Sequence, residues 1–174
     1  MQKNLLAGVL LLGLVVLPIS AVWILHGEFT NRSPAPGTRI PSLILSTRDG
    51  STFALGDFIG KRGLIFFFTV ECSHCRKEFS NLTSLYPQYA KDLRFFFVSL
   101  SEVADTRVFL GINESTRPVF YYNSRNAGNA IDLSLVPTLY LVDEGLILRS
   151  KYVGERSLEG DKQIIEEFIH DSAR

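Results

Sequence analysis

The sequence carries no excess of charge of either sign, because 18 Lys and Arg residues balance 18 Asp and Glu residues. Without a basic field, nothing in it attracts nucleic acid over long range, so we exclude that class of partner. Internal repeats and low-complexity tracts are missing as well. With 174 residues, 46% of them hydrophobic, the chain has the length for one domain of ordinary size plus an appendage.

Cysteine is scarce, and this restricts what the thiols can do. Cys72 and Cys75 are the only two in the chain. A structural zinc site needs four ligands and would have to recruit His26 or His170 from the two ends of the chain, so no metal site is predicted. A disulfide within so short a loop would add little stability. Two inert buried thiols remain an alternative to a reactive pair.

Charged residues are missing from residues 4–25, which read NLLAGVLLLGLVVLPISAVWIL. At about 1.5 Å per residue, a helix of this length crosses a hydrocarbon core of roughly 30 Å. Lys3 and the terminal amine precede the run, so the positive-inside rule puts Met1 in the cytoplasm. We expect residues 1–3 to be cytoplasmic, residues 4–25 to form a transmembrane signal-anchor helix, and the remainder to lie on the extracytoplasmic (periplasmic) side.

A signal peptide cleaved after Ala21 is the alternative interpretation of this segment. Its apolar run is longer than a normal signal-peptide core, and Ile19 stands where a small residue is preferred. Either way the domain is exported. Residues 26–38 are polar with two prolines and predict a stiff, extended linker, and residues 39–174 are expected to form one domain.

Within residues 39–174, strand patterns alternate with helix patterns. Residues 64–70, LIFFFTV, form a continuous apolar run typical of a strand buried on both faces, and residues 75–89 carry apolar side chains at helical spacing. The order of elements predicts an α/β fold with a mixed central sheet and helices on both faces. The expected strands are 43–46, 52–55, 64–70, 95–100, 119–122, 138–142 and 146–153, and the expected helices are 75–89, 102–110 and 158–169.

The two cysteines form the motif Cys72-Ser73-His74-Cys75 at the junction between a buried strand and a helix. Cys72 is expected at the helix N-terminus, where unpaired backbone N–H groups and the positive end of the dipole stabilise a thiolate. Cys75 lies one turn further along, close enough to attack a mixed disulfide. This spacing predicts one exposed reactive sulfur and one sheltered resolving sulfur.

Three stretches together resemble the thioredoxin-like family, and more narrowly its exported, membrane-anchored TlpA and ResA type. They are LIFFFTVECSHCRKEF at residues 64–79, LVPTLYLVDEGLILRSKYVG at residues 135–154, and the opening that begins IPSLILSTRDGSTFALGDF at residue 40. The resemblance implies a thioredoxin-like fold with an N-terminal hairpin and a central insertion at residues 103–129. It also implies that Cys72 is the attacking nucleophile and Cys75 the resolving thiol.

Two further roles follow from the resemblance. Pro137 would be a cis proline beside the dithiol, leaving the backbone of Val136 and Thr138 free to pair with a substrate peptide. Glu78, one helical turn after Cys75, would be the general base that accepts the proton of that thiol. A solvated glutamate paired with Lys77 or Arg76 is the alternative for Glu78.

Other residues of the motif are expected to modulate the dithiol. An imidazole of His74 near the Cys72 sulfur would favour the thiolate and make the disulfide more oxidising. Glu71 stands where the family usually has a tryptophan, and its negative charge would disfavour the thiolate. Ser73 replaces a frequent proline or glycine, and Phe66 replaces a buried aspartate of thioredoxin itself.

The sequence therefore predicts an extracytoplasmic thiol–disulfide oxidoreductase that exchanges electrons with proteins through a mixed disulfide on Cys72. No cofactor is expected beyond the Cys72–Cys75 disulfide. The family implies protein partners such as apocytochrome c or copper-site assembly proteins, and a membrane thiol reductase as electron donor. Whether the protein reduces, oxidises or isomerises its substrates is left open.

Two other functions compete with this prediction. A thiol peroxidase is suggested by Thr69-x-x-Cys72, although Ile65 takes the place of that motif's proline. A copper-binding assembly factor is suggested because soft thiolates suit Cu(I). The copper-delivery relatives use a wider cysteine spacing and a distal histidine, for which His170 in the terminal helix is a poor candidate.

Overall fold

The computed structural model describes residues 33–58, 60–111, 118–122 and 131–171. The predicted signal-anchor helix at 4–25 lies outside these ranges, as does most of the predicted linker at 26–38. No helix in the described part of the chain combines the length and the apolar character needed to cross a membrane.

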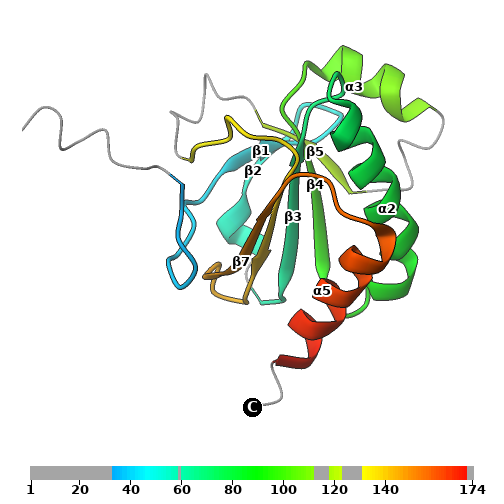
Figure 1. The fold of residues 1–174 in the computed structure, drawn as a ribbon. Helices are drawn as coiled ribbons and strands as arrows, with labels where there is room; N and C mark the ends of the chain where they lie inside the picture. The colour runs from blue at the N-terminus through cyan, green and yellow to red at the C-terminus, as the bar shows by residue number, and fades with distance from the viewer. Residues whose placement is uncertain (1–32, 59, 112–117, 123–130, 172–174) are drawn as a thin grey trace, which may run out of the picture. The chain divides into compact units, whose positions relative to one another are not determined.

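A seven-stranded mixed sheet forms the centre of the domain (Figure 1). Its order is β2-β1-β5-β4-β3-β6-β7, with β3, β4 and β5 parallel to one another and the remaining pairings antiparallel. The strands are β1 (Ile44–Ser46), β2 (Thr52–Ala54), β3 (Gly63–Phe68), β4 (Arg94–Ser99), β5 (Val119–Tyr121), β6 (Thr138–Val142) and β7 (Leu148–Val153). Each lies within a residue or two of its predicted range.

The central strand β3 separates two apolar cores, because successive side chains of a strand point to opposite faces. Leu64, Phe66 and Phe68 belong to one core, and Ile65 and Phe67 belong to the other. All six residues of β3 are buried. The continuous apolar run in the sequence is thus a strand covered on both faces, as predicted.

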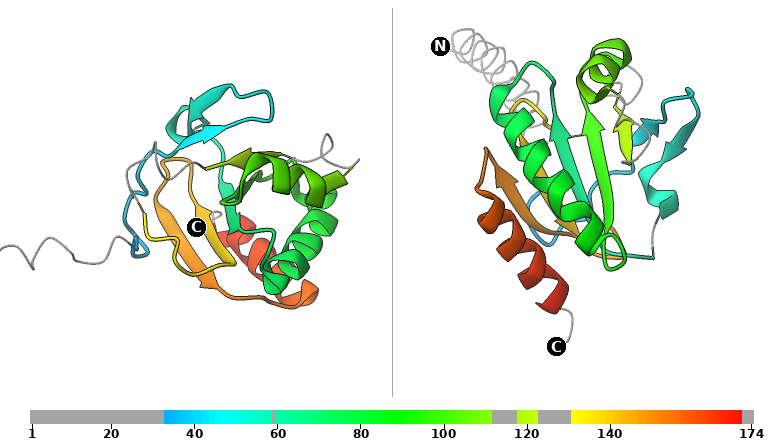
Figure 2. Two further views of the ribbon diagram at one scale, coloured as in Figure 1. Left: turned by 90° about the horizontal axis from the view of Figure 1, so that it is seen from above. Right: turned by 90° about the vertical axis from the view of Figure 1, so that its right-hand side faces the viewer.

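Three α-helices are described, and all three pack on the same core (Figure 2). They are α2 (Ser73–Tyr89), α3 (Val103–Leu110) and α5 (Leu158–His170). Phe79, Leu110 and Ile165, one from each helix, join the core of Phe66. Helices on both faces were predicted, and the α-helices within the described residues cover one of the two faces.

Extended chain and one short 3-10 helix cover the opposite face of the sheet. Ile40 and Leu43 precede β1, Leu55 opens the 3-10 helix η2 (Leu55–Phe58), and Ile131 opens the described segment that leads to β6. These residues bury their side chains against Ile65 and its neighbours without forming an α-helix. Isolated apolar residues in loops carry no periodicity, which is why the sequence pattern did not indicate this arrangement.

The predicted N-terminal hairpin is confirmed by the pairing of Ile44 with Ala54 and of Ser46 with Thr52. Its turn contains Gly50, whose φ of +85° belongs to the region that favours glycine. The segment predicted as a central insertion supplies α3 and the strand β5, which lies between β4 and β1 in the sheet.

Candidate active site: the dithiol at the start of α2

Cys72 caps the N-terminus of α2 with its sulfur, since the backbone N–H of Cys75 donates to Cys72 Sγ at 3.2 Å. Cys72 is half-buried and Cys75 is fully buried, and both are free thiols. A sulfur at this position also meets the positive end of the helix dipole. The structure thus has one accessible sulfur, that of Cys72, and one sheltered sulfur, that of Cys75, as predicted.

Burial raises the pKa of the Cys75 thiol from 9.0 to about 12, and the neighbouring sulfur of Cys72 adds to this rise. The carboxylate of Glu78 also raises it, whereas a backbone contact with Thr69 opposes the shift. Cys75 is therefore a thiol at neutral pH, and it must lose its proton before it can attack another sulfur.

The loop before β6 lies against the dithiol. The Val136–Pro137 peptide bond is cis, which confirms that prediction, and the thiol of Cys72 is 4.0 Å from the carbonyl oxygen of Val136. The loop is held in place by the N–H of Gly154, which donates to the Pro137 carbonyl at 2.8 Å, and by the Thr138 hydroxyl, which donates to the Leu135 carbonyl at 2.7 Å.

Glu78 is buried, with none of its surface exposed. Its Oε2 accepts a hydrogen bond from the backbone N–H of Arg156 at 2.8 Å, and its Oε1 forms an ion pair with the guanidinium of the same residue. The alternative of a solvated glutamate paired with Lys77 or Arg76 is therefore wrong. Burial raises the pKa of Glu78 from 4.5 to about 7, although Arg156 opposes that shift.

His74 lies on the exposed side of α2 and contacts Glu155, with 2.8 Å between its Nδ1 and Glu155 Oε2. Lys77 forms an ion pair with the other oxygen of the same carboxylate. Lys77 and His74 together lower the pKa of Glu155. The expected influence of His74 on the Cys72 sulfur stays a prediction.

Glu71 is exposed beside Cys72, and its carboxylate accepts a hydrogen bond from the hydroxyl of Ser101 at 2.9 Å. The same hydroxyl oxygen accepts from the backbone N–H of Val70 at 3.0 Å. Ser101 therefore connects the end of β4 to the link between β3 and α2. Ser73, the first residue of α2, is exposed.

Four residues that contact the site residues or their partners carried no signal in the sequence. Arg156 lies 78 positions from Glu78, and Glu155 lies 81 positions from His74. Only folding brings such positions together. The other two are Ser101 and Asp161, and Asp161 is a buried carboxylate of α5 that accepts a hydrogen bond from Arg156 Nε at 2.8 Å.

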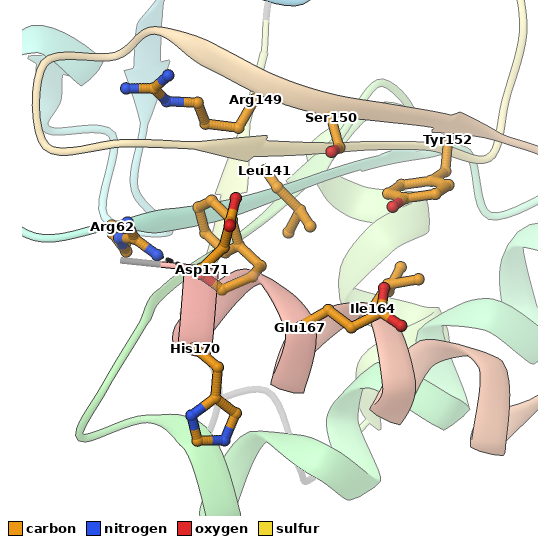
Figure 3. A pocket seen from close by; sticks show the side chains of 10 residues that line it. Arg62, Leu141, Arg149, Ser150, Tyr152, Ile164, Glu167, His170 and Asp171 are labelled. Atoms are coloured by element: carbon orange, nitrogen blue, oxygen red, sulfur yellow. Dashed lines mark hydrogen bonds between the residues drawn. The ribbon is translucent and has the colours of Figure 1, made fainter. Parts of the chain in front are cut away.

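A hollow of about 920 Å³ lies elsewhere, between α5 and the strands β6 and β7 (Figure 3). Arg62 and Arg149 line it together with the carboxylates of Glu167 and Asp171. None of the predicted site residues lines this hollow, but His170 does. Within the described ranges, no three His, Cys, Asp or Glu side chains are grouped as metal ligands would be.

The sequence profile of the AhpC/TSA family matches residues 36–151. The thioredoxin-like protein YneN of Bacillus subtilis is 26% identical over 160 residues, covering 88% of this chain and 92% of YneN. The thiol-disulfide oxidoreductase ResA of Geobacillus thermodenitrificans is 26% identical over 141 residues, covering 79% of this chain and 81% of ResA.

The fold also matches solved structures. A putative thiol:disulfide interchange protein DsbE from Chlorobium tepidum superposes with a TM-score of 0.66 at 23% identity, covering 79% of this chain and 99% of that one. The fold and the relatives define the class as a thioredoxin-like thiol–disulfide oxidoreductase of the TlpA/ResA type. The family profile covers more than half of the sequence, and the chain belongs to the AhpC/TSA family.

Proposed function

We propose that this chain is a membrane-tethered, extracytoplasmic oxidoreductase that exchanges its dithiol with protein substrates through a mixed disulfide on Cys72. The observation that carries the proposal is the inequality of the two sulfurs. Cys72 is accessible and caps α2, while Cys75 is buried and protonated at neutral pH. An accessible nucleophile and a sheltered resolving thiol are what a two-step exchange requires.

In the reducing direction, the Cys72 thiolate attacks one sulfur of a substrate disulfide. The substrate S–S bond breaks, a Cys72–substrate bond forms, and the first substrate sulfur leaves as a thiolate. Cys75 then attacks Cys72 Sγ, releasing the second substrate thiolate and forming the Cys72–Cys75 disulfide. Two electrons pass from the dithiol to the substrate, and no cofactor is needed.

Glu78 takes the role of general base in the second step. It lies one helical turn after Cys75, and its charge already acts on the pKa of that thiol. Its own pKa of about 7 suits a base that must be ionised near neutral pH and still hold a proton. The proton of Cys75 passes to the Glu78 carboxylate as the thiolate attacks.

The loop at Pro137 provides the docking surface for the substrate chain. The carbonyl of Val136 faces the Cys72 sulfur, and the backbone of Val136 is the proposed partner of an extended substrate segment. The backbone of Thr138, predicted as a second partner, is already paired with Phe67 on one side and with Val153 on the other, because β6 is an inner strand of the sheet. Protein dithiols and disulfides are the proposed substrates, with apocytochrome c and copper-site assembly proteins among them. A membrane thiol reductase would return electrons to the Cys72–Cys75 disulfide.

Trapping tests this function directly. In Cys75→Ala the mixed disulfide on Cys72 cannot be resolved, so partner proteins should remain covalently attached, and mass spectrometry would name them. Cys72→Ser should trap none and should lose the reduction of protein disulfides. Peroxide consumption retained in Cys75→Ser would instead favour a thiol peroxidase, and stoichiometric retention of Cu(I) without turnover would favour a copper-binding factor.

Direction of electron flow is set by the reduction potential of the Cys72–Cys75 couple. A value near about −270 mV would make the protein a reductant, and one near about −120 mV would make it an oxidant. Equilibration of the purified protein with glutathione buffers of defined ratio measures this potential.

A further inference from the structure

Three charged side chains meet in the interior between α2 and α5. Glu78 and Asp161 are both fully buried carboxylates, and Arg156 from the link between β7 and α5 is the cation between them. Arg156 pairs through its Nη2 with Glu78 and through its Nε with Asp161, where the distance is 2.8 Å. One guanidinium thus serves two carboxylates.

Other contacts hold this group in place. The amide of Asn81 donates to the Arg156 carbonyl at 3.0 Å and to Asp161 Oδ2 at 3.4 Å. The guanidinium of Arg156 also lies over the ring of Tyr152, 5.0 Å from its centroid. The geometry of the Glu78 carboxylate is therefore determined by residues outside the CxxC motif.

We propose that Arg156 and Asp161 are positioning residues for the resolution step: they orient the Glu78 carboxylate beside Cys75 and set the pH at which it can accept the proton of that thiol. This inference rests on the proposed role of Glu78 as general base. It adds two residues that act through Glu78 and touch no substrate.

The balance of charge explains how the two residues act. Burial raises the pKa of Glu78, Arg156 lowers it, and the second carboxylate, Asp161, raises it again. Glu78 in turn raises the pKa of the Cys75 thiol and of the Lys77 ammonium, and Glu155 acts on Lys77 from the link between β7 and α5. Arg156 and Asp161 therefore push the proton affinity of Glu78 in opposite directions.

This opposition has a consequence for the chemistry. When Cys75 attacks the mixed disulfide, its proton moves to Glu78, and the buried group loses one negative charge. Arg156 then neutralises Asp161 alone, so no unpaired charge is left in the interior after the transfer. Removing either neighbour changes the pH at which Glu78 is ready to receive the proton.

The experiment follows the reaction of the reduced, full-length protein with dithiobis(nitrobenzoate). Attack by Cys72 releases the first nitrothiolate and leaves the second attached to Cys72. Attack by Cys75 on Cys72 Sγ releases the second nitrothiolate and closes the disulfide. The second phase therefore measures resolution, and its rate is recorded between acid and alkaline pH for each variant.

Asp161→Asn is the main variant, because it removes one of two negative charges and keeps a side chain of the same shape. We expect the midpoint of its second phase to move to lower pH by about one unit. Arg156→Gln should move the midpoint in the opposite direction. Glu159→Gln, an exposed neighbour on the first turn of α5, is the matched control and should leave the midpoint unchanged.

Opposite shifts in the two variants would support the inference, because a purely structural defect would not change sign. If Glu78→Gln abolishes the pH dependence but Asp161→Asn keeps the wild-type midpoint, the inference is wrong and Glu78 remains the base. If Glu78→Gln keeps the wild-type profile, the proposed base itself is wrong. Release of only one nitrothiolate by the wild type would contradict the two-step exchange.

Discussion

At the scale of single residues, the dithiol is defined by the different surroundings of its two sulfurs. Cys72 lies at the end of a helix with one side accessible, whereas Cys75 is enclosed by the core that contains Phe68 and Phe79. The two residues are chemically identical in the sequence. Their different roles come from burial, which penalises the charged form of Cys75.

This difference predicts selective alkylation. In the reduced protein, iodoacetamide should modify Cys72 rapidly and Cys75 hardly at all between pH 7 and about 9, because the pKa of Cys75 is raised to about 12. Mass spectrometry should find a single adduct under native conditions and two adducts in guanidinium chloride. Cys72→Ser serves as the control and should show no native adduct, while equal labelling of both sulfurs would contradict the assignment.

Glu78 predicts a specific dependence of stability on pH. Burial raises its pKa from 4.5 to about 7, so between these values the folded chain holds a proton that the unfolded chain has lost. The stability that this proton contributes is complete below pH 4.5 and disappears as the pH rises through 7. A shift of this size corresponds to roughly 3 kcal/mol.

Glu78→Gln cannot titrate at this position. The unfolding free energy of the wild type should therefore decrease relative to that of the variant as the pH increases from 4.5 to 7. Urea titrations of both proteins at several pH values measure this difference. All other carboxyl groups are present in both proteins, so their contributions cancel when the two free energies are subtracted. A constant difference across this range would show that Glu78 is ionised throughout.

At the scale of elements, the link between β7 and α5 clamps the helix that carries the dithiol. Glu155 contacts His74 and Lys77 on the exposed side of α2, while Arg156 reaches the buried Glu78. These contacts occur within the first turns of α2, next to the motif. Arg76 also holds the start of α2 in place. Its Nε donates to the Val70 carbonyl at 2.6 Å, and its guanidinium lies over the ring of Phe109.

The buried part of the clamp is expected to dominate its contribution to stability. Arg156→Ala leaves the carboxylates of Glu78 and Asp161 buried without a cation and should cost about 3–5 kcal/mol. Glu155→Ala, one residue away, breaks only ion pairs that water already screens and should cost much less. The loss of stability in each variant is measured from the midpoint of its denaturation in guanidinium chloride. Equal losses would mean that the buried ion pair carries no special energetic role.

At the scale of the whole molecule, the catalytic domain is expected to work without its N-terminal segment. All the residues placed at the site lie between Glu71 and Asp161, and the described residues from 33 onward form one compact unit. The proposed transmembrane helix at 4–25 would then determine only where the domain is located.

Deletion of residues 1–32 tests this separation. The shortened protein should leave the membrane fraction and appear in the soluble fraction, and both phases of its reaction with dithiobis(nitrobenzoate) should keep the wild-type rates. The full-length protein, fractionated in parallel, is the control. Loss of the exchange reaction in a folded, shortened protein would show that the N-terminal segment takes part in the chemistry.

The sequence alone determined the strands, the helices and the position of the dithiol. Periodicity of two or about 3.6 residues is a local property, and so is the junction of an apolar strand with a CxxC helix, so both can be predicted from neighbouring residues. The resemblance carried by three separate stretches added the cis proline at Pro137, which lies beside Cys72 as expected.

Only the tertiary structure decided how each charged residue acts. Whether Glu78 is solvated or buried depends on what packs over α2, and that is the distant segment with Arg156 and Asp161. The same holds for His74, whose partner is Glu155, and for the face of the sheet that the helices cover. Desolvation and Coulomb energies depend on distances in space, and those distances do not exist until the chain has folded.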